Sequence, residues 1–249
     1  MMTDQAWPAK RHSDEAVFLD IDGTLLDLAA TPLSVRVPTG LPALLRALAR
    51  AHGQALALIS GRSLADIDFL LPPAALAPGL AVAAEHGAIL RDAHGTIIRC
   101  IEPPAALRHL APALRAAIAA CPGTLLEEKK FGFALHWRAA PHHADHLTRV
   151  ATTLTEAQPN LTLQPAHQAL EIRAQGPNKA DALTAFLQID PFRGRKPLFI
   201  GDDLTDEPAI AASIAQGGRG LHVARDFPNG PASVRAWLAA SLSEPVTDA

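Results

Sequence analysis

The chain has very little cysteine, no long hydrophobic run and no strong excess of either charge. Cys100 and Cys121 are its only cysteines, and two thiols cannot staple a chain of this length, so we expect both to be reduced. No apolar run reaches about 18 residues without a charge or a proline, the length that a membrane-spanning helix needs. The first residues also lack the basic and then apolar pattern of a signal peptide. These absences predict a cytoplasmic protein with no membrane partner.

The charge balance excludes a second class of partner. A formal net charge of -3 gives no sign of the clustered basic surface that nucleic acid attracts. We therefore expect no nucleic-acid partner, a small-molecule ligand and a monomer. The length of 249 residues allows one large domain, or a core with a smaller insert.

Strand patterns alternate with helical patterns toward both ends of the chain. Residues 17–19 and 55–59 are apolar runs, and leucines at helical spacing lie between them at 41–52. Near the other end, a helical pattern at 178–187 precedes a strand pattern at 197–200. Such alternation is typical of an α/β fold with a parallel sheet.

The middle of the chain has a different pattern. Helices are predicted at 107–120 and 142–157, and short strands at 131–138, 161–164 and 169–172. We expect residues 102–171 to form a small α+β unit that acts as a lid over the site. Residues 1–101 and 172–249 then form the main domain.

Polar residues follow three of the predicted strands at the point where each strand ends. They are Asp20 and Asp22 after the first strand, Ser60, Gly61 and Arg62 after the second, and Gly201, Asp202 and Asp203 after the third. In an open parallel sheet, ligands bind outside the carboxyl ends of the strands. We therefore expect these residues to converge on one site.

Asp20 and Asp22 match the two carboxylates that a phosphoryl transfer to a side chain needs. One carboxylate attacks phosphorus and forms an aspartyl-phosphate, while the other protonates the leaving oxygen and later activates water. We assign Asp20 as the nucleophile and Asp22 as the acid and base, with Gly23 permitting the turn between them. Taken alone, the motif has two alternatives, an ordinary acidic loop or a calcium site.

A hard cation is expected beside these carboxylates, because they and a phosphate dianion repel one another. The predicted cofactor is Mg2+, held by Asp20, the backbone carbonyl of Asp22, and Asp202. Segment 201–207 holds four carboxylates, which is a poor composition for a turn unless a cation gathers them. Asp203 and Asp206 are expected to support the ligands, with Asp206 orienting a metal-bound water or Lys179.

Ser60 and Lys179 are predicted to hold the phosphoryl group. A hydroxyl and backbone amides after a strand can bind phosphate oxygens, and Gly61 would allow their close approach. Lys179 begins a predicted helix and can neutralise the nucleophile. The alternative for Lys179 is a solvated surface lysine.

With these four clusters in this order, the chain resembles the haloacid dehalogenase-like phosphatases. The family's four motifs stand at Asp20-Ile21-Asp22-Gly23-Thr24-Leu25, Ser60, Lys179 and Gly201-Asp202-Asp203. This resemblance implies a doubly wound, Rossmann-like core. Because the insert lies between the second and third motifs, it also implies the family's larger, second class of cap.

More of the chain is similar to the trehalose-6-phosphate phosphatases. The matching segments are Ser60-Gly61-Arg62, Glu85-His86-Gly87, Glu127-Glu128-Lys129, His136-Trp137-Arg138, Glu171-Ile172-Arg173 and 201–207. The resemblance implies that Glu127, Lys129, Arg138 and Glu171 hold sugar hydroxyls, since carboxylates accept from hydroxyls and cations donate to them. Gly61, Arg62, Glu85 and His86 are expected to contact the substrate as well. The chain departs from the family's common residues at Lys130, Trp137, Ala174 and Ala180.

Simpler interpretations of some of these segments stay open. Strand alternation alone would place Trp137 in the core of the insert and His136 at its surface. Glu85-His86-Gly87 is also consistent with a turn that ends a strand.

The resemblance implies hydrolysis of trehalose 6-phosphate to trehalose and phosphate, with the cap closing over the disaccharide. Phosphatases of sucrose phosphate or mannosyl-phosphoglycerate would share the core and differ in the cap. A phosphomutase would return the phosphoryl group to the sugar. A phospho-accepting signalling module also pairs an acidic pocket with magnesium, but it lacks the insert and needs no acid at Asp22.

Overall fold

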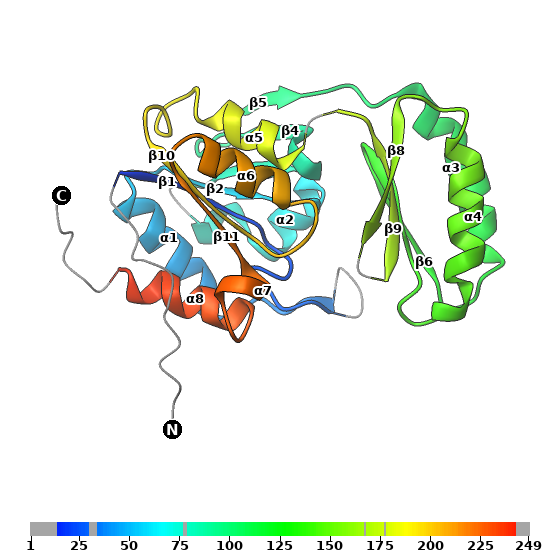
Figure 1. Cartoon of the computed structure of the whole chain (residues 1–249), viewed down its shortest axis with the longest axis horizontal. Helices are drawn as coiled ribbons and strands as arrows, with labels where there is room; N and C mark the ends of the chain where they lie inside the picture. The colour runs from blue at the N-terminus through cyan, green and yellow to red at the C-terminus, as the bar shows by residue number, and fades with distance from the viewer. Residues whose placement is uncertain (1–13, 30–33, 77–78, 167, 177, 243–249) are drawn as a thin grey trace. The chain divides into compact units, whose positions relative to one another are not determined.

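A computed structural model of the chain describes residues 14–29, 34–76, 79–166, 168–176 and 178–242, which form two compact units (Figure 1). The larger unit is Met1–Cys100 with Pro177–Ala249, and the smaller is Ile101–Gly176. The predicted boundary between 171 and 172 falls inside strand β9 (Ala169–Ala174), whose pairing with β8 continues to Ala174. The roles of the two units as catalytic core and cap stay predictions.

A seven-stranded sheet forms the centre of the larger unit, in the order β11-β10-β1-β2-β3-β4-β5. Its strands are β1 (Glu15–Leu19), β2 (Leu56–Ile59), β3 (Ala81–Ala84), β4 (Ile89–Arg91), β5 (Ile97–Cys100), β10 (Lys196–Gly201) and β11 (Arg219–His222). Strands β1, β2, β3, β10 and β11 run parallel, and β4 and β5 are antiparallel additions at one edge.

Helices cover both faces of this sheet. Val17 and Leu19 of β1 belong to the core formed with α1 (Leu41–Ala51), α2 (Leu64–Leu70) and α8 (Pro231–Ala240). Ala16 and Phe18 belong to the core formed with α5 (Lys179–Phe186) and α6 (Glu207–Ala215). Successive side chains of a strand point to opposite faces, so β1 is buried on both sides, which explains its continuous apolar run. The predicted doubly wound α/β fold is confirmed.

The smaller unit is a four-stranded antiparallel sheet with two helices on one face. The strand order is β6-β7-β9-β8, with β6 at Leu125–Lys129, β7 at Gly132–His136 and β8 at Leu161–Ala166. Helices α3 (Ala105–Ala119) and α4 (Ala144–Thr155) pack beside each other (Figure 1) and bury Phe133, Leu135 and Ile172 of the sheet. Trp137 is partly buried against this core, as strand alternation predicts. The opposite face, the polar face of this sheet, carries Glu127, Lys129, His136 and Glu171.

None of the helices in the described part of the chain has the length and apolar character that crossing a membrane requires.

Candidate active site

The carboxyl ends of β1, β2 and β10 bring Asp20, Ser60 and Asp202 to one edge of the larger sheet. Leu19 is in register with Leu58 of β2 and Ile200 of β10. Asp20 follows Leu19, and its N–H donates to the Ile200 carbonyl at 3.0 Å. Strands β2 and β3 lie on one side of β1 and β10 and β11 on the other. Asp20 therefore stands at a topological switch point, where open α/β sheets bind ligands.

Lys179 joins two buried carboxylates. Its Nζ donates to Asp20 Oδ1 and to Asp206 Oδ1, each at 2.7 Å, and Lys179 is only 3% exposed. Burial alone would lower the pKa of Lys179, but the charges of Asp20 and Asp206 raise it above its ordinary value. The alternative of a solvated surface lysine is therefore wrong. The ammonium group is a fixed positive charge beside the predicted nucleophile.

A helix cap fixes the position of Lys179. Asn178 caps α5 by accepting from the N–H groups of Ala180 and Asp181, and the Asp181 carboxylate accepts from the Asn178 N–H in return. This reciprocal capping box satisfies the first amides of the helix. Lys179, the first residue of α5, is held at a defined place as a result.

Three carboxylates gather at the same edge. Oxygens of Asp20, Asp202 and Asp206 lie within 4.8 Å of one another. Burial raises the pKa of Asp20 well above its ordinary value and that of Asp202 to about 7, and the neighbouring carboxylates add to both effects. An oxygen-only set of this kind is what a hard divalent cation prefers, and a cation there would favour the ionised forms.

Within the acidic cluster of Asp20, Asp202 and Asp206, both carboxylate oxygens of Asp206 already accept hydrogen bonds from protein groups. One oxygen accepts from Lys179, and the other accepts from the backbone N–H groups of Asp202 and Asp203, at 3.0 and 3.2 Å. Asp20 and Asp202 are therefore the carboxylates that suit a cation best. The side chain of Asp203 turns to the N–H and hydroxyl of Thr205, so it supports the loop after β10.

Gly23 makes room for Asp202. A Cβ at position 23 would lie 2.0 Å from Asp202 Oδ2, and the backbone there has a φ of +72°. The N–H of Gly23 also donates to the Leu26 carbonyl, at 2.8 Å, which closes the turn after β1. Any side chain would strain this turn and displace Asp202 from the cluster, which explains the glycine that follows Asp22.

Arg62 holds the carboxylate of Asp22. Its Nε lies 2.5 Å from Asp22 Oδ2 and its Nη2 lies 2.6 Å from Oδ1, which is a two-pronged ion pair. Arg62 is buried, and the Asp22 side chain is 30% exposed. From the sequence, Arg62 was expected to contact the substrate. In the structure its guanidinium forms an ion pair with Asp22, the predicted acid and base.

The loop after β3 packs against the residues that follow β2. The N–H of His86 donates to the Ser60 carbonyl and the N–H of Glu85 donates to the Arg62 carbonyl, both at 2.9 Å. Glu85 and His86 are buried and have φ values of 46° and 58°, a backbone conformation that is unfavourable for these residues. A Cβ on Gly61 would lie 2.5 Å from His86 Nε2. Gly61 therefore makes room for the ring of His86, and not for phosphate as the sequence suggested. The hydrogen bond from His86 also fixes the backbone of Ser60.

Three of the four predicted sugar-binding residues of the smaller unit, Glu127, Lys129 and Glu171, meet on its polar face. Lys129 Nζ is 2.8 Å from Glu171 Oε1 and 3.8 Å from Glu127 Oε1. His136 Nε2 is 2.9 Å from Glu127 Oε2, a contact that sequence reasoning missed although it placed His136 at the surface. Arg138 lies two residues beyond β7 and is half-buried. Glu127, Lys129 and Glu171 are thus brought into one network.

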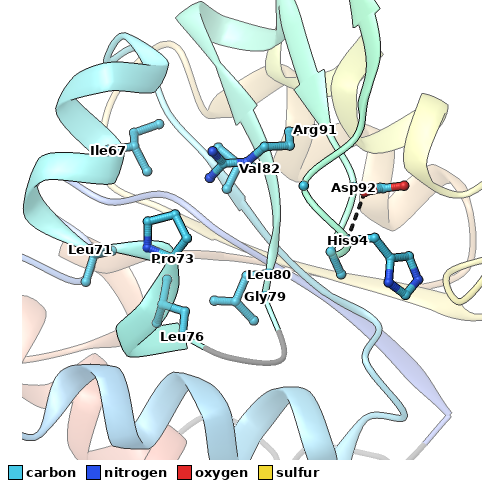
Figure 2. Close-up of a pocket in the computed structure, with 12 residues that line it drawn as sticks. Ile67, Leu71, Pro73, Leu76, Gly79, Leu80, Val82, Arg91, Asp92 and His94 are labelled. Carbon is cyan, nitrogen blue, oxygen red and sulfur yellow. Dashed lines mark hydrogen bonds between the residues drawn. The ribbon is translucent and has the colours of Figure 1, made fainter.

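A pocket of about 220 Å³ lies elsewhere in the larger unit (Figure 2). It is lined by apolar residues of α2 and β3 and by Arg91, Asp92 and His94 near the β4–β5 turn. Two hydrogen bonds of 2.7 Å join the Arg91 guanidinium to Asp68. The pocket is at the amino end of β3, the opposite end of that strand from Glu85, and so it is separate from the acidic cluster.

Comparisons with known proteins point to one family. The trehalose-phosphatase family model matches residues 18–227. The chain is similar to the trehalose-6-phosphate phosphatase of Escherichia coli (strain K12), with 40% identity over 208 residues that cover 84% of this chain and 77% of that protein. It is also similar to a probable trehalose-phosphate phosphatase of Sinorhizobium fredii, with 41% identity over 214 residues that cover 86% of this chain and 79% of that protein.

Solved structures resemble the fold over nearly the whole chain. The C-terminal domain of a Candida albicans trehalose-6-phosphate phosphatase superposes with a TM-score of 0.74 at 17% identity, covering 93% of both chains. A haloacid dehalogenase-like hydrolase from Bacteroides thetaiotaomicron gives a TM-score of 0.63 at 15% identity, covering 92% of this chain and 99% of that chain. At these identities the likeness shows the fold alone.

Proposed function

Because the chain belongs to the trehalose-phosphatase family, we propose that it hydrolyses trehalose 6-phosphate to trehalose and phosphate through an aspartyl-phosphate on Asp20. The observation that carries the proposal is the buried Lys179 between Asp20 and Asp206, beside the ion pair of Asp22 and Arg62. This arrangement provides a carboxylate nucleophile, a fixed positive charge and a second carboxylate at one edge of the sheet. These are the groups that transfer of a phosphoryl group to a carboxylate requires.

The reaction proceeds in two displacements at phosphorus. In the first, an oxygen of Asp20 bonds to phosphorus and the bond from phosphorus to the sugar oxygen breaks. Asp22 gives the sugar oxygen a proton, which Asp22 binds at the oxygen that gives up its contact with Arg62. In the second, water attacks the same phosphorus, Asp22 takes its proton, and the Asp20 carboxylate is released with phosphate. Lys179 and Ser60 hold phosphoryl oxygens, and Lys179 offsets the charge that builds up on them.

The proposed cofactor is Mg2+, held by Asp20, Asp202 and the backbone carbonyl of Asp22. When bound, it would neutralise carboxylate and phosphate charge and so allow the two to approach. Asp206 positions Lys179 and, through the N–H of Asp202, the loop that carries a ligand. The space that Gly23 leaves for Asp202 supports this assignment.

We propose that the smaller unit acts as the cap and selects the sugar. Its polar face presents carboxylates and an ammonium group in one network, which are acceptors and donors for hydroxyls. An apolar substrate would take these charged groups out of water without offering them hydrogen bonds in return, which costs free energy. The proposed hydroxyl-binding residues are Glu127, Lys129, Arg138 and Glu171.

A panel of phosphate esters assayed with Mg2+ tests the proposed substrate. Phosphate release should be fastest with trehalose 6-phosphate, by about tenfold or more in kcat/KM over sucrose phosphate and mannosyl-phosphoglycerate, since a polar network rejects a sugar whose hydroxyls do not match it. Comparable rates on these esters would contradict the substrate assignment and leave a broader sugar phosphatase. Transfer of the phosphoryl group back to sugar, without phosphate release, would favour the phosphomutase alternative.

Changing Arg62 to alanine should affect esters according to their leaving groups. Without the two-pronged contact, Asp22 is no longer held to protonate the sugar oxygen, so kcat for trehalose 6-phosphate should fall about 10²-fold. With p-nitrophenyl phosphate, whose phenolate leaves without a proton, release of the first p-nitrophenolate should change little. Rapid-mixing kinetics with both esters measure the difference, and Arg91→Ala, which removes an ion pair at the other end of the sheet, is the control. Equal losses on both esters would instead assign Arg62 to the phosphoryl group.

A further inference from the structure

We propose that His136 is a positioning residue that holds Glu127 for a sugar hydroxyl and thereby contributes to substrate selectivity. The inference rests on the proposed function and deepens it. His136 is half-buried on the polar face of the smaller sheet, and its ring lies against one of the four residues already expected to bind hydroxyls.

The first ground is that the two carboxylate oxygens of Glu127 have different partners. Oε2 is 2.9 Å from His136 Nε2, whereas Oε1 is 3.8 Å from Lys129 Nζ. The first distance is a hydrogen bond and the second is too long for one. A hydroxyl at Oε1 could donate to Glu127 and accept from Lys129. His136 thus occupies one oxygen and directs the other toward the ammonium group.

The second ground is the charge of Glu127. Burial tends to raise its pKa, but the hydrogen bond from His136 and the charge of Lys129 bring that pKa below its ordinary value. An ionised carboxylate only accepts hydrogen bonds, so His136 Nε2 must carry the hydrogen that it shares with Oε2. His136 therefore favours the form of Glu127 that accepts from a sugar hydroxyl.

The third ground is the shape of β7 along this face. Gly132, Ala134 and His136 lie on the same side of the strand, because successive side chains of a strand point to opposite faces. A Cβ on Gly132 would lie 2.2 Å from the Ile172 carbonyl oxygen, so no larger residue fits there. Lys129 of β6 reaches across these small residues to Glu171 of β9, at 2.8 Å. His136 is the first large side chain of β7 on this face. It stands at the end of the strip of small residues, in contact with Glu127.

The test compares His136→Leu with His136→Gln. Leucine removes the donor, whereas the glutamine amide is long enough to donate to Glu127. His136→Leu should raise KM for trehalose 6-phosphate about tenfold, as expected for loss of a hydrogen bond to a charged group, with kcat within about twofold. Its kcat/KM for p-nitrophenyl phosphate, which offers no hydroxyls, should stay at the wild-type value. His136→Gln should recover most of the loss, and His146→Leu, at an exposed histidine of α4, should change neither ester.

The outcomes separate this inference from the proposed function. A wild-type KM in His136→Leu, an equal loss on both esters, or no recovery in His136→Gln would each overturn the positioning role. If the wild-type enzyme prefers another sugar phosphate, the proposed substrate fails, and the same comparison with that ester still decides the role of His136.

Discussion

Asp20→Asn is expected to abolish phosphate release from trehalose 6-phosphate, with kcat falling by about 10⁴-fold or more, because the attacking oxygen is lost. Asparagine has nearly the same shape, and its side-chain oxygen can still accept from Lys179, which lies 2.7 Å from Asp20 Oδ1. The site should therefore keep its structure while losing its nucleophile. The measurement is steady-state phosphate release at saturating substrate, with the unfolding temperature recorded for both proteins.

A matched control for this variant lies seven residues further along the same segment. The side chain of Asp27 is 69% exposed, and its Oδ2 lies 3.6 Å from Arg235 Nη2, which makes this a weak surface ion pair. Asp27→Asn should therefore leave kcat unchanged. Substantial turnover in Asp20→Asn, with normal folding, would move the nucleophile elsewhere. Substituting Asp202 should then be examined first, because its carboxylate belongs to the same cluster.

The second large effect is expected for Asp22→Asn, and it should depend on the ester. With trehalose 6-phosphate, kcat should fall about 10²–10⁴-fold, because the sugar oxygen leaves without a proton donor. With p-nitrophenyl phosphate, transfer to Asp20 should remain fast, while hydrolysis of the intermediate should be slow because no base activates water. Rapid mixing should therefore give a burst of one p-nitrophenolate per enzyme, followed by slow turnover.

Two results would contradict the role given to Asp22. Unchanged turnover of trehalose 6-phosphate in Asp22→Asn would remove both the acid and the base function from this residue. An equal loss on both esters with no burst would mean that Asp22 serves the first transfer itself. Asp27→Asn, at an exposed carboxylate, is the control and should behave like the wild type.

The convergence of the core residues was predictable from the sequence because its signal is local. An apolar run that stops at Asp20, another that stops at Ser60 and a third that stops before Asp202 each identify a strand end, and a parallel sheet brings such ends to one edge. The helical start at Lys179 was visible for the same reason. The identity of the residue at each strand end was therefore sufficient to predict which residues form this part of the site.

The contacts among these residues were not predictable, because they depend on sheet register and on side-chain direction. Arg62 is 40 positions from Asp22, and only their places on adjacent strand ends bring them together. His86 reaches Gly61 through a turn with positive φ, which its sequence does not favour. The β4–β5 hairpin was missed as well, because β5 is largely exposed and lacks a buried pattern.

The smaller sheet contained one signal that went unused. On β7, small residues at Gly132 and Ala134 alternate with the buried Phe133 and Leu135. Small residues on one face of a strand leave room for a side chain from a neighbouring strand. Here Lys129 of β6 extends over β7 to Glu171 of β9. Cross-strand pairing was needed to connect His136 with Glu127.

The most direct test of the account is the site of covalent phosphorylation. Asp22→Asn enzyme is mixed with p-nitrophenyl phosphate and Mg2+, quenched in acid during the slow phase, digested and analysed by mass spectrometry. The account predicts one phosphoryl group per enzyme, on Asp20, and none when Asp20 is also changed to asparagine. A phosphoryl group on any other residue, or a burst that leaves no phosphorylated enzyme, would contradict it.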